Sequence, residues 1–345
     1  MSTLTMAATP AVRPVPWQRL GWVVWRRYRT TLVATLGVLG LVALYLLITG
    51  HQIHTAYAAI QACAPRHSEA CQFMWNTFQN TYGSTGLLGF VQVLLPGLVG
   101  AFVGAPLLAR ELETGTFRYA WTQSVGRMRW ALALLIPGAV GVAAVMVAFG
   151  ALVSWRNHPL VEAGITSRMD GSLFPAGDPA VAGWALAAFA LGVFAGLVWR
   201  RVVPALATAI VAWFGLAVLA SIVLRAHYLA PLTTTKLQIN STGIDVAQWW
   251  TKNGARVDDA RLNQVLHAAG IQGIDPSGHS HAQAAPGSQA IDPVHYLIQH
   301  GYTQVTSYQP DSRYWTFQWI EFGWLATLAV ALLAATLWLL RRRPA

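Results

Sequence analysis

Six long runs of apolar residues dominate the pattern along this chain of 345 residues. Each run holds 19 to 23 residues and contains no Asp, Glu, Lys, Arg or His. A helix needs roughly 20 such residues to cross about 30 Å of hydrocarbon, whereas a surface helix of a soluble domain keeps a charged face. We therefore predict an all-α membrane protein with six transmembrane helices, at residues 31–49, 86–108, 131–153, 181–199, 202–224 and 322–340.

The segment before the first run has a different periodicity. Between Trp17 and Tyr28, aromatic and aliphatic residues recur at helical spacing, and arginines occupy most of the remaining positions. Such a basic amphipathic helix suits the inner membrane interface; the alternative is a plain helical extension of the first span. Residues 1–16 carry three prolines and small polar residues, which is typical of a disordered tail. Residues 1–30 are thus a tail followed by an interfacial helix.

Three polar segments lie on the other side, at 50–85, 154–180 and 225–321. The last has 97 residues, too many for an unstructured connection in a compact protein. It separates spans one to five (31–224) from the sixth span and the basic C-terminus (322–345). Within it we predict short helices at 258–269 and 244–253, each followed by glycine, a loop at 276–293 and an interfacial aromatic stretch at 308–324.

Basic residues set the expected orientation. With six spans both termini share one side, whose 59 residues carry 14 of the 23 Lys and Arg; that side comprises 1–30, 109–130, 200–201 and 341–345. The positive-inside bias places both termini in the cytoplasm. The net charge of +10 then reflects topology, so no nucleic-acid partner is expected. The first apolar run is longer than that of a signal peptide, and we expect it to remain as an uncleaved anchor.

Other candidate chemistry is sparse. The chain has no GxxxxGK[ST] phosphate loop, so ATP hydrolysis is expected on a separate subunit and not on this chain. His279 and His281 lack the further ligands of a zinc site, and neither a metal nor another cofactor is expected. Cys63 and Cys71 share one outer segment in an oxidising compartment, which makes them a disulfide candidate; two unpaired thiols are the alternative.

Two GxxxG pairs lie within the spans, at Gly100/Gly104 and Gly192/Gly196. Such pairs let helix backbones approach closely. The contact they form is expected either within one subunit or between two.

The polar loop 109–130 holds Glu111 and Glu113, the only acidic residues on the predicted cytoplasmic side. We expect 109–119 to form an amphipathic helix with Leu108 and Leu112 toward the membrane and Thr114-Gly115-Thr116 as an interruption. The charged residues expected to face the cytosol are Arg110, Glu111, Glu113 and Arg118. A loop whose charges are merely solvated is the alternative.

This loop resembles that of the permeases of type-2 ATP-binding cassette (ABC) transporters. Those permeases typically carry an arginine/glutamate pair, then Glu-x-Gly-Thr, then a short stretch with Ser or Pro, then a basic residue. Here the pattern reads Arg110-Glu111-Leu112-Glu113-Thr114-Gly115-Thr116, followed by Ser124 and Arg127, and the family's proline is replaced around 124–126. The six spans, the interfacial helix and the large fifth-to-sixth segment also resemble the family, and the closing aromatic stretch resembles its actinobacterial members.

The resemblance implies a permease subunit of an ABC exporter in a bacterial plasma membrane. In the family this loop is the coupling helix that docks on the ATPase, which implies coupling roles for Arg110, Glu111, Glu113, Gly115, Thr116 and Arg118. Expected partners are an ABC ATPase subunit, a second permease copy in a homo- or heterodimer, and the lipid bilayer. The competing interpretations are a membrane enzyme with its active site outside and a non-transporting anchor or sensor.

The lack of charge in the apolar runs favours an apolar or amphipathic cargo, because a charged cargo usually meets ionisable partners within the membrane. Gln92, Thr208 and Ser221 are the few polar candidates along the spans.

Overall fold

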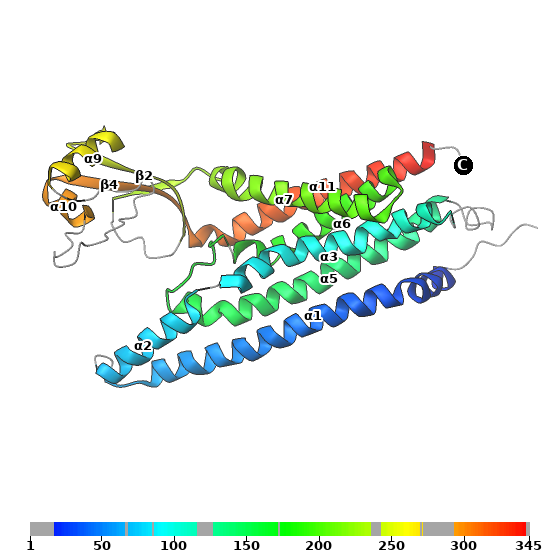
Figure 1. The fold of residues 1–345 in the computed structure, drawn as a ribbon, viewed down its shortest axis with the longest axis horizontal. Helices are drawn as coiled ribbons and strands as arrows, with labels where there is room; N and C mark the ends of the chain where they lie inside the picture. The colour runs from blue at the N-terminus through cyan, green and yellow to red at the C-terminus, as the bar shows by residue number, and fades with distance from the viewer. Residues whose placement is uncertain are drawn as a thin grey trace, which may run out of the picture. The chain divides into compact units, whose positions relative to one another are not determined.

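The computed structural model of the protein describes residues 17–65, 68–84, 86–115, 127–171, 173–235, 243–269, 271 and 293–342. The chain is mostly helical (Figure 1). The helices are α1 (Trp17–Ala62), α2 (Glu69–Tyr82), α3 (Gly86–Glu113), α5 (Arg127–Glu162), α6 (Ala180–Trp199), α7 (Val202–Leu219), α8 (Arg225–His227), α9 (Asp259–Ala268), α10 (Pro293–Gln299) and α11 (Tyr314–Arg342), with short 3-10 or π turns η1 (Phe174–Ala176), η2 (Ala220–Leu224) and η3 (Asp311–Arg313).

The chain divides into two compact units. The membrane unit comprises Met1–Pro159, Ser172–Val218 and Gln318–Ala345, and the sheet unit comprises Leu160–Gly171 and Leu219–Phe317.

Six helical segments within the described residues are long and apolar enough to cross a membrane, which confirms the six predicted spans. They are Val33–Ala62, Gly89–Glu113, Met128–Glu162, Ala180–Trp199, Val202–His227 and Asp311–Arg342. Most continue beyond the apolar runs. The helix α1 has 46 residues, or about 69 Å at 1.5 Å per residue, so it is more than twice as long as the hydrocarbon is thick. The stretch from Trp17 is continuous with the first span. This is the alternative of a plain helical extension of that span.

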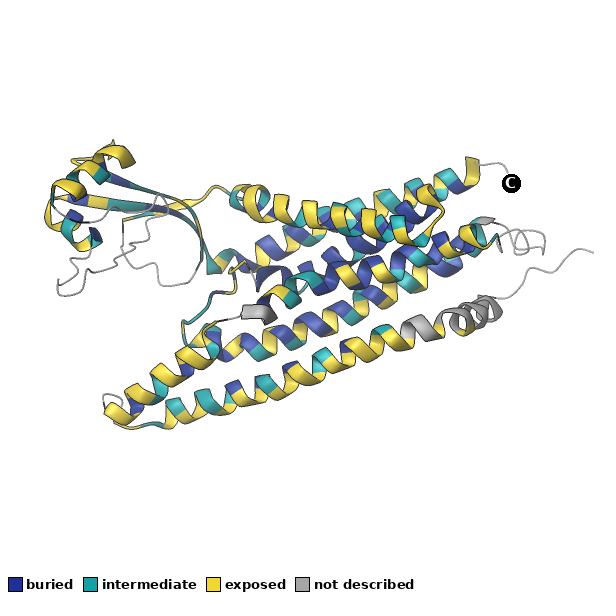
Figure 2. Cartoon of the chain, in the orientation of Figure 1, coloured by how far each residue is buried: buried dark blue, intermediate teal, exposed yellow. Residues whose placement is uncertain are grey.

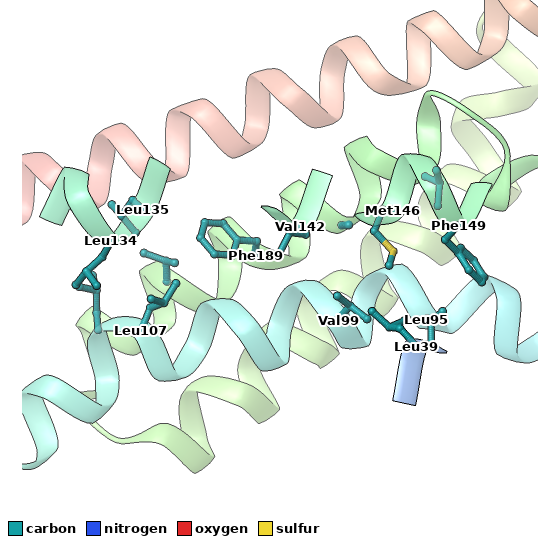
Figure 3. Close-up of a cluster of buried hydrophobic side chains, with 14 of the residues drawn as sticks. Leu39, Leu95, Val99, Leu107, Leu134, Leu135, Val142, Met146, Phe149 and Phe189 are labelled. Atoms are coloured by element: carbon teal, nitrogen blue, oxygen red, sulfur yellow. The ribbon is translucent and has the colours of Figure 1, made fainter. Parts of the chain in front are cut away.

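The core of the membrane unit lies around α6. Fifteen of its 20 residues are buried, as expected of a helix that is apolar on every side. Figure 2 shows buried positions concentrated on α6 and α3, whereas α1 is largely exposed. Side chains of α3, α5 and α6 point toward one another in this core (Figure 3), among them Leu107, Val142 and Phe189.

The sheet unit contains a four-stranded antiparallel sheet in the order β1-β4-β2-β3. Its strands are β1 (Leu232–Thr234), β2 (Gly243–Lys252), β3 (Ala255–Val257) and β4 (Tyr302–Pro310). Leu262 and Leu266 of α9 and Leu297 of α10 pack with Trp250 and Tyr302 of the sheet. The segment 225–321 therefore has a small hydrophobic core of its own.

One predicted helix in this segment is wrong. Residues 244–253 form most of β2, while the predicted helix at 258–269 is confirmed as α9. The β-branched and aromatic residues of 244–251 favour a strand. Asn253 and Gly254 have φ of 51° and 79°, the geometry of a two-residue hairpin turn, for which Asn-Gly is the strongest short-range signal. Gly254 therefore turns a hairpin and does not end a helix. The aromatic stretch at 308–324 is split between β4 and α11.

At the far end of α1 the chain folds back into α2. The structure joins Cys63 and Cys71 by a disulfide, with their Cα atoms 5.8 Å apart. Ser68 begins α2 as its N-cap, and its Oγ accepts a hydrogen bond from the Cys71 N–H at 3.3 Å. Phe78 of α2 contacts Tyr57 of α1, with ring centroids 6.0 Å apart. The predicted outer segment 50–85 is thus a helical hairpin.

Candidate functional site

The second span continues directly into the predicted coupling loop. The helix α3 ends at Glu113, where both the N–H and the hydroxyl of Thr114 donate hydrogen bonds to the Arg110 carbonyl oxygen, at 3.1 and 2.8 Å. Gly115 follows with φ of +69°, a left-handed conformation that favours glycine and commonly follows a helix end. Residues 109–113 are therefore the last turn of α3 and not a separate amphipathic helix. Thr116 and Arg118 lie outside the described residues.

The continuity of α3 also fixes which side chains are exposed. Leu108 is buried, and Leu112 is partly buried against the core. Both therefore pack inside the protein, whereas the sequence analysis expected them to face the membrane. Glu111 is only 3% exposed, and the prediction that it faces the cytosol is wrong, because it follows Leu107 by one helical turn on the buried face. Arg110 and Glu113 are exposed, as predicted.

Glu113 connects two of the predicted inner segments. Its Oε2 accepts a hydrogen bond from the backbone N–H of Val202 at 3.3 Å. Val202 is the first residue of α7, and a carboxylate at a helix N-terminus is stabilised by the unpaired N–H groups and the helix dipole. The neighbouring Arg200 ends α6 in a left-handed conformation, with φ of 54°. The end of α3 is thereby linked to the turn between α6 and α7.

The two GxxxG pairs meet within one chain. A Cβ on Gly100 or Gly104 would overlap a backbone carbonyl oxygen of α6. A Cβ on Gly192 would lie 2.7 Å from the Ala105 nitrogen, and one on Gly196 would lie 2.9 Å from the Ala105 oxygen. The backbones of α3 and α6 are therefore in direct contact along both motifs, an arrangement that only residues without a side chain permit. The sequence left open whether the GxxxG pairs make a contact within one subunit or between two, and in the structure the contact is within one subunit.

A family model described as "ABC-2 membrane transporter related" matches residues 36–225, which is more than half of the chain. The chain belongs to this family. It is accordingly a multi-pass membrane permease of the type-2 ABC transporter kind. No curated protein and no solved structure matches it.

The permease also has a buried polar network that the sequence analysis missed. Glu321 of α11 is fully buried and accepts a hydrogen bond from the indole N–H of Trp184 at 2.7 Å. One turn earlier, Gln318 donates to the Phe174 carbonyl oxygen at 2.7 Å and accepts from the Ala180 N–H at 2.9 Å. These bonds tie α11 to the start of α6. The signal was the spacing of Gln318 and Glu321, which places both on one helical face.

The helical segments of the structure are longer than the apolar runs, and the added parts carry charges. They include Arg156, Arg225 and Glu321, each of which lies just outside an apolar run. The apolar runs themselves contain no charge, and the preference for an apolar or amphipathic cargo stays a prediction. Among the predicted polar candidates, Gln92 is 2% exposed and its Nε2 has no hydrogen-bond partner among the described residues. Thr208 donates to the Pro204 carbonyl of its own helix at 2.8 Å.

Asp178 lies just before α6, against α5. A Cβ on Gly150 would overlap its carboxylate, and its Oδ1 has no hydrogen-bond partner within the described part of the chain. Burial raises the pKa of Asp178 to about 6, because a low-dielectric environment disfavours the charged form.

No group of three or more His, Cys, Asp or Glu is placed to hold a metal ion among the described residues. His279 and His281 fall outside them.

Proposed function

We propose that this permease is the membrane subunit of an ATP-driven exporter in a bacterial plasma membrane. It works as a dimer of two permease copies with two separate ATPase subunits. The family membership and the six spans support a transporter, and the basic residues at the predicted inner ends support cytoplasmic termini. The direction of transport and the dimer follow from the resemblance to type-2 permeases.

In this proposal the mechanism is mechanical. ATP binding closes the ATPase dimer and displaces the loop 109–130, and the helices rearrange around a path between the two copies. Because α3 leads directly into this loop, a displacement of the loop moves the end of α3. Because α3 and α6 are in backbone contact, α6 moves with α3 as one body.

The hydrogen bond between Glu113 and Val202 is the observation that carries the proposed coupling route. It lies at the point where the loop begins. It gives the loop a direct connection to α7, in addition to α3 and α6. In this arrangement the two exposed charges have different tasks. Arg110, which makes no side-chain hydrogen bond among the described residues, is available to the ATPase, and Glu113 transmits movement within the permease.

The test measures whether α7 moves when the ATPase binds nucleotide. Spin labels replace Val203 on α7 and Val140 on α5, both exposed residues, in a background without native cysteines. The distance between the labels is measured in the complex with its ATPase, without nucleotide and with ATP trapped by vanadate. We expect the nucleotide to shift this distance by about 2 Å or more, and we expect Glu113→Ala to abolish the shift while the ATPase stays bound.

Glu113→Gln is the matched control. Its side-chain oxygen still accepts the Val202 N–H, so the nucleotide-dependent shift should persist. An equal shift in Glu113→Ala and in the unmodified permease would show that α7 is not driven through this contact.

A further inference from the structure

Arg156 is held between α1 and α5 by neutral groups. It lies on α5, is half-buried, and its Nε donates a hydrogen bond to the hydroxyl oxygen of Thr49 on α1 at 3.0 Å. Its Nη1 donates to the side-chain oxygen of Asn157, also at 3.0 Å. Neither acceptor carries a charge.

The charge of this guanidinium is therefore not balanced within the described residues. A guanidinium has five N–H donors, and these two hydrogen bonds leave three of them unused. The electrostatic partner of Arg156 among the described residues is Tyr45, which is neither an aspartate nor a glutamate. A half-buried cation beside hydrocarbon is costly without a partner. The arrangement suits an anion with several acceptor oxygens.

The groups that hold Arg156 are themselves fixed. Asn157 is 3% exposed, and its Nδ2 donates to the Val153 carbonyl oxygen at 2.8 Å, which orients its own oxygen toward the guanidinium. The Thr49 hydroxyl donates to the Tyr45 carbonyl oxygen at 2.9 Å, so it can accept from Arg156. The guanidinium is thus positioned before any ligand arrives.

A second contact between α1 and α5 lies beside it. The ring of His54 stacks on that of Trp155, with centroids 4.8 Å apart, and a ring nitrogen of His54 is 2.9 Å from the Trp155 carbonyl oxygen. A Cβ on Gly50 would overlap the Trp155 indole. The two helices are therefore in close contact at this height.

The height of the site matches the phosphate layer of a membrane. Thr49 ends the first apolar run and Val153 ends the third, and Arg156 is three residues further on, about 4.5 Å beyond the apolar end. Trp155 and Tyr45 add the aromatic residues typical of this depth. On α1, Leu41, Leu44 and Ile48 are exposed and offer an apolar surface below the headgroup level.

We propose that Arg156, positioned by Thr49 and Asn157, binds the phosphate of a phospholipid headgroup and so seats one lipid where α1 and α5 meet. The phosphate oxygens accept the unused N–H donors in charge-assisted hydrogen bonds, and the acyl chains follow the exposed apolar residues of α1.

The test measures lipid binding to the full chain in detergent by native mass spectrometry. The probes are dioctanoyl phosphatidylglycerol, dioctanoylglycerol, which lacks the phosphate, and inorganic phosphate. We expect the phospholipid to bind and dioctanoylglycerol not to bind. Inorganic phosphate at the same concentration should not displace the phospholipid. Arg156→Gln should weaken phospholipid binding at least about tenfold, the loss expected for hydrogen bonds to a charged group.

Arg168→Gln is the matched control, because Arg168 is exposed and makes no hydrogen bond among the described residues; it should bind the phospholipid as the unmodified chain does. If Arg156→Gln does not fold, Arg156→Lys takes its place and should bind more weakly than the unmodified chain, since lysine lacks the planar set of donors. The proposal is overturned if the Arg156 variant binds the phospholipid with unchanged affinity, or if dioctanoylglycerol binds equally well. Displacement by inorganic phosphate would identify a soluble anion as the ligand and also overturn it.

Discussion

Replacing Gly192 by alanine tests the contact between α3 and α6, on which the proposed transmission of movement depends. The new Cβ would lie 2.7 Å from the Ala105 nitrogen, 3.1 Å from the Gly104 carbonyl carbon and 3.3 Å from the Ala101 oxygen. All three are backbone atoms, so no side chain can rotate away, and the two helices must separate by several tenths of an ångström along a closely packed contact. Overpacking of this kind costs about 1–3 kcal/mol, and for a chain of this length the change lowers the melting temperature by about 1–2 °C per kcal/mol.

Gly141→Ala provides the comparison. Gly141 lies on α5 in the same unit, and a Cβ there meets nothing within 4 Å. Alanine has a higher helix propensity than glycine, so this variant should melt at the same temperature as the unmodified permease or slightly above it. The assay is thermal unfolding of the purified permeases in one detergent, followed by tryptophan fluorescence. If Gly192→Ala melts no lower than Gly141→Ala, the close backbone contact between α3 and α6 is refuted.

Three further predictions concern topology, the disulfide and pH. In a background lacking Cys63 and Cys71, single cysteines at Thr3 and Ser288 should react with an impermeant reagent from opposite sides of the membrane; reaction of both on intact cells would contradict six spans with cytoplasmic termini. In protein taken from membranes under thiol-blocking conditions, mass mapping should find Cys63 joined to Cys71, and two alkylated sulfurs would reject the bridge. Because burial raises the pKa of Asp178 from 3.8 to about 6, the folded state retains a proton that the unfolded chain has released. The stability should therefore fall as pH rises from about 4 to 6. Asp178→Asn should remove about 1 kcal/mol of this dependence in pH-resolved melting, a figure reduced for solvent screening, and an unchanged pH profile would contradict it.

The six spans were predictable because their signal is local. A run of 19 to 23 apolar residues without charge is long enough to cross the hydrocarbon of a membrane and has no charged face for water. The helix α9 was predictable from acidic residues at its start, apolar residues on one face and the glycine that follows. The hairpin of β2 and β3 was missed because a ten-residue segment with apolar residues at several spacings fits a helix and a strand alike. The Asn253-Gly254 turn decided between them, and it was present in the sequence.

The exposure of charged residues was harder to predict because it depends on distant parts of the chain. Glu111 was assigned to a cytosolic face on the assumption that a new helix begins near residue 109, but α3 does not break there. Glu321 was assigned to the outer segment, although Trp184, 137 residues away in sequence, supplies the hydrogen bond that accompanies its burial. Neither the continuity of α3 past residue 109 nor the contact of Glu321 with Trp184 follows from the periodicity of the segment itself. The bond between Glu113 and Val202 likewise joins residues 89 positions apart.

Co-purification of the permease with a candidate ABC ATPase tests the central claim most directly. Arg110 is exposed and makes no side-chain hydrogen bond among the described residues, so Arg110→Glu reverses a charge at the start of the loop 109–130 without removing an internal contact. Loss of a charged pair at a buried interface costs about 2–5 kcal/mol, so the retained ATPase should fall by at least about tenfold. Arg29→Glu, which reverses an exposed charge on α1, should retain it fully. Equal recovery of the ATPase with Arg110→Glu and with the unmodified permease would contradict docking at the end of α3.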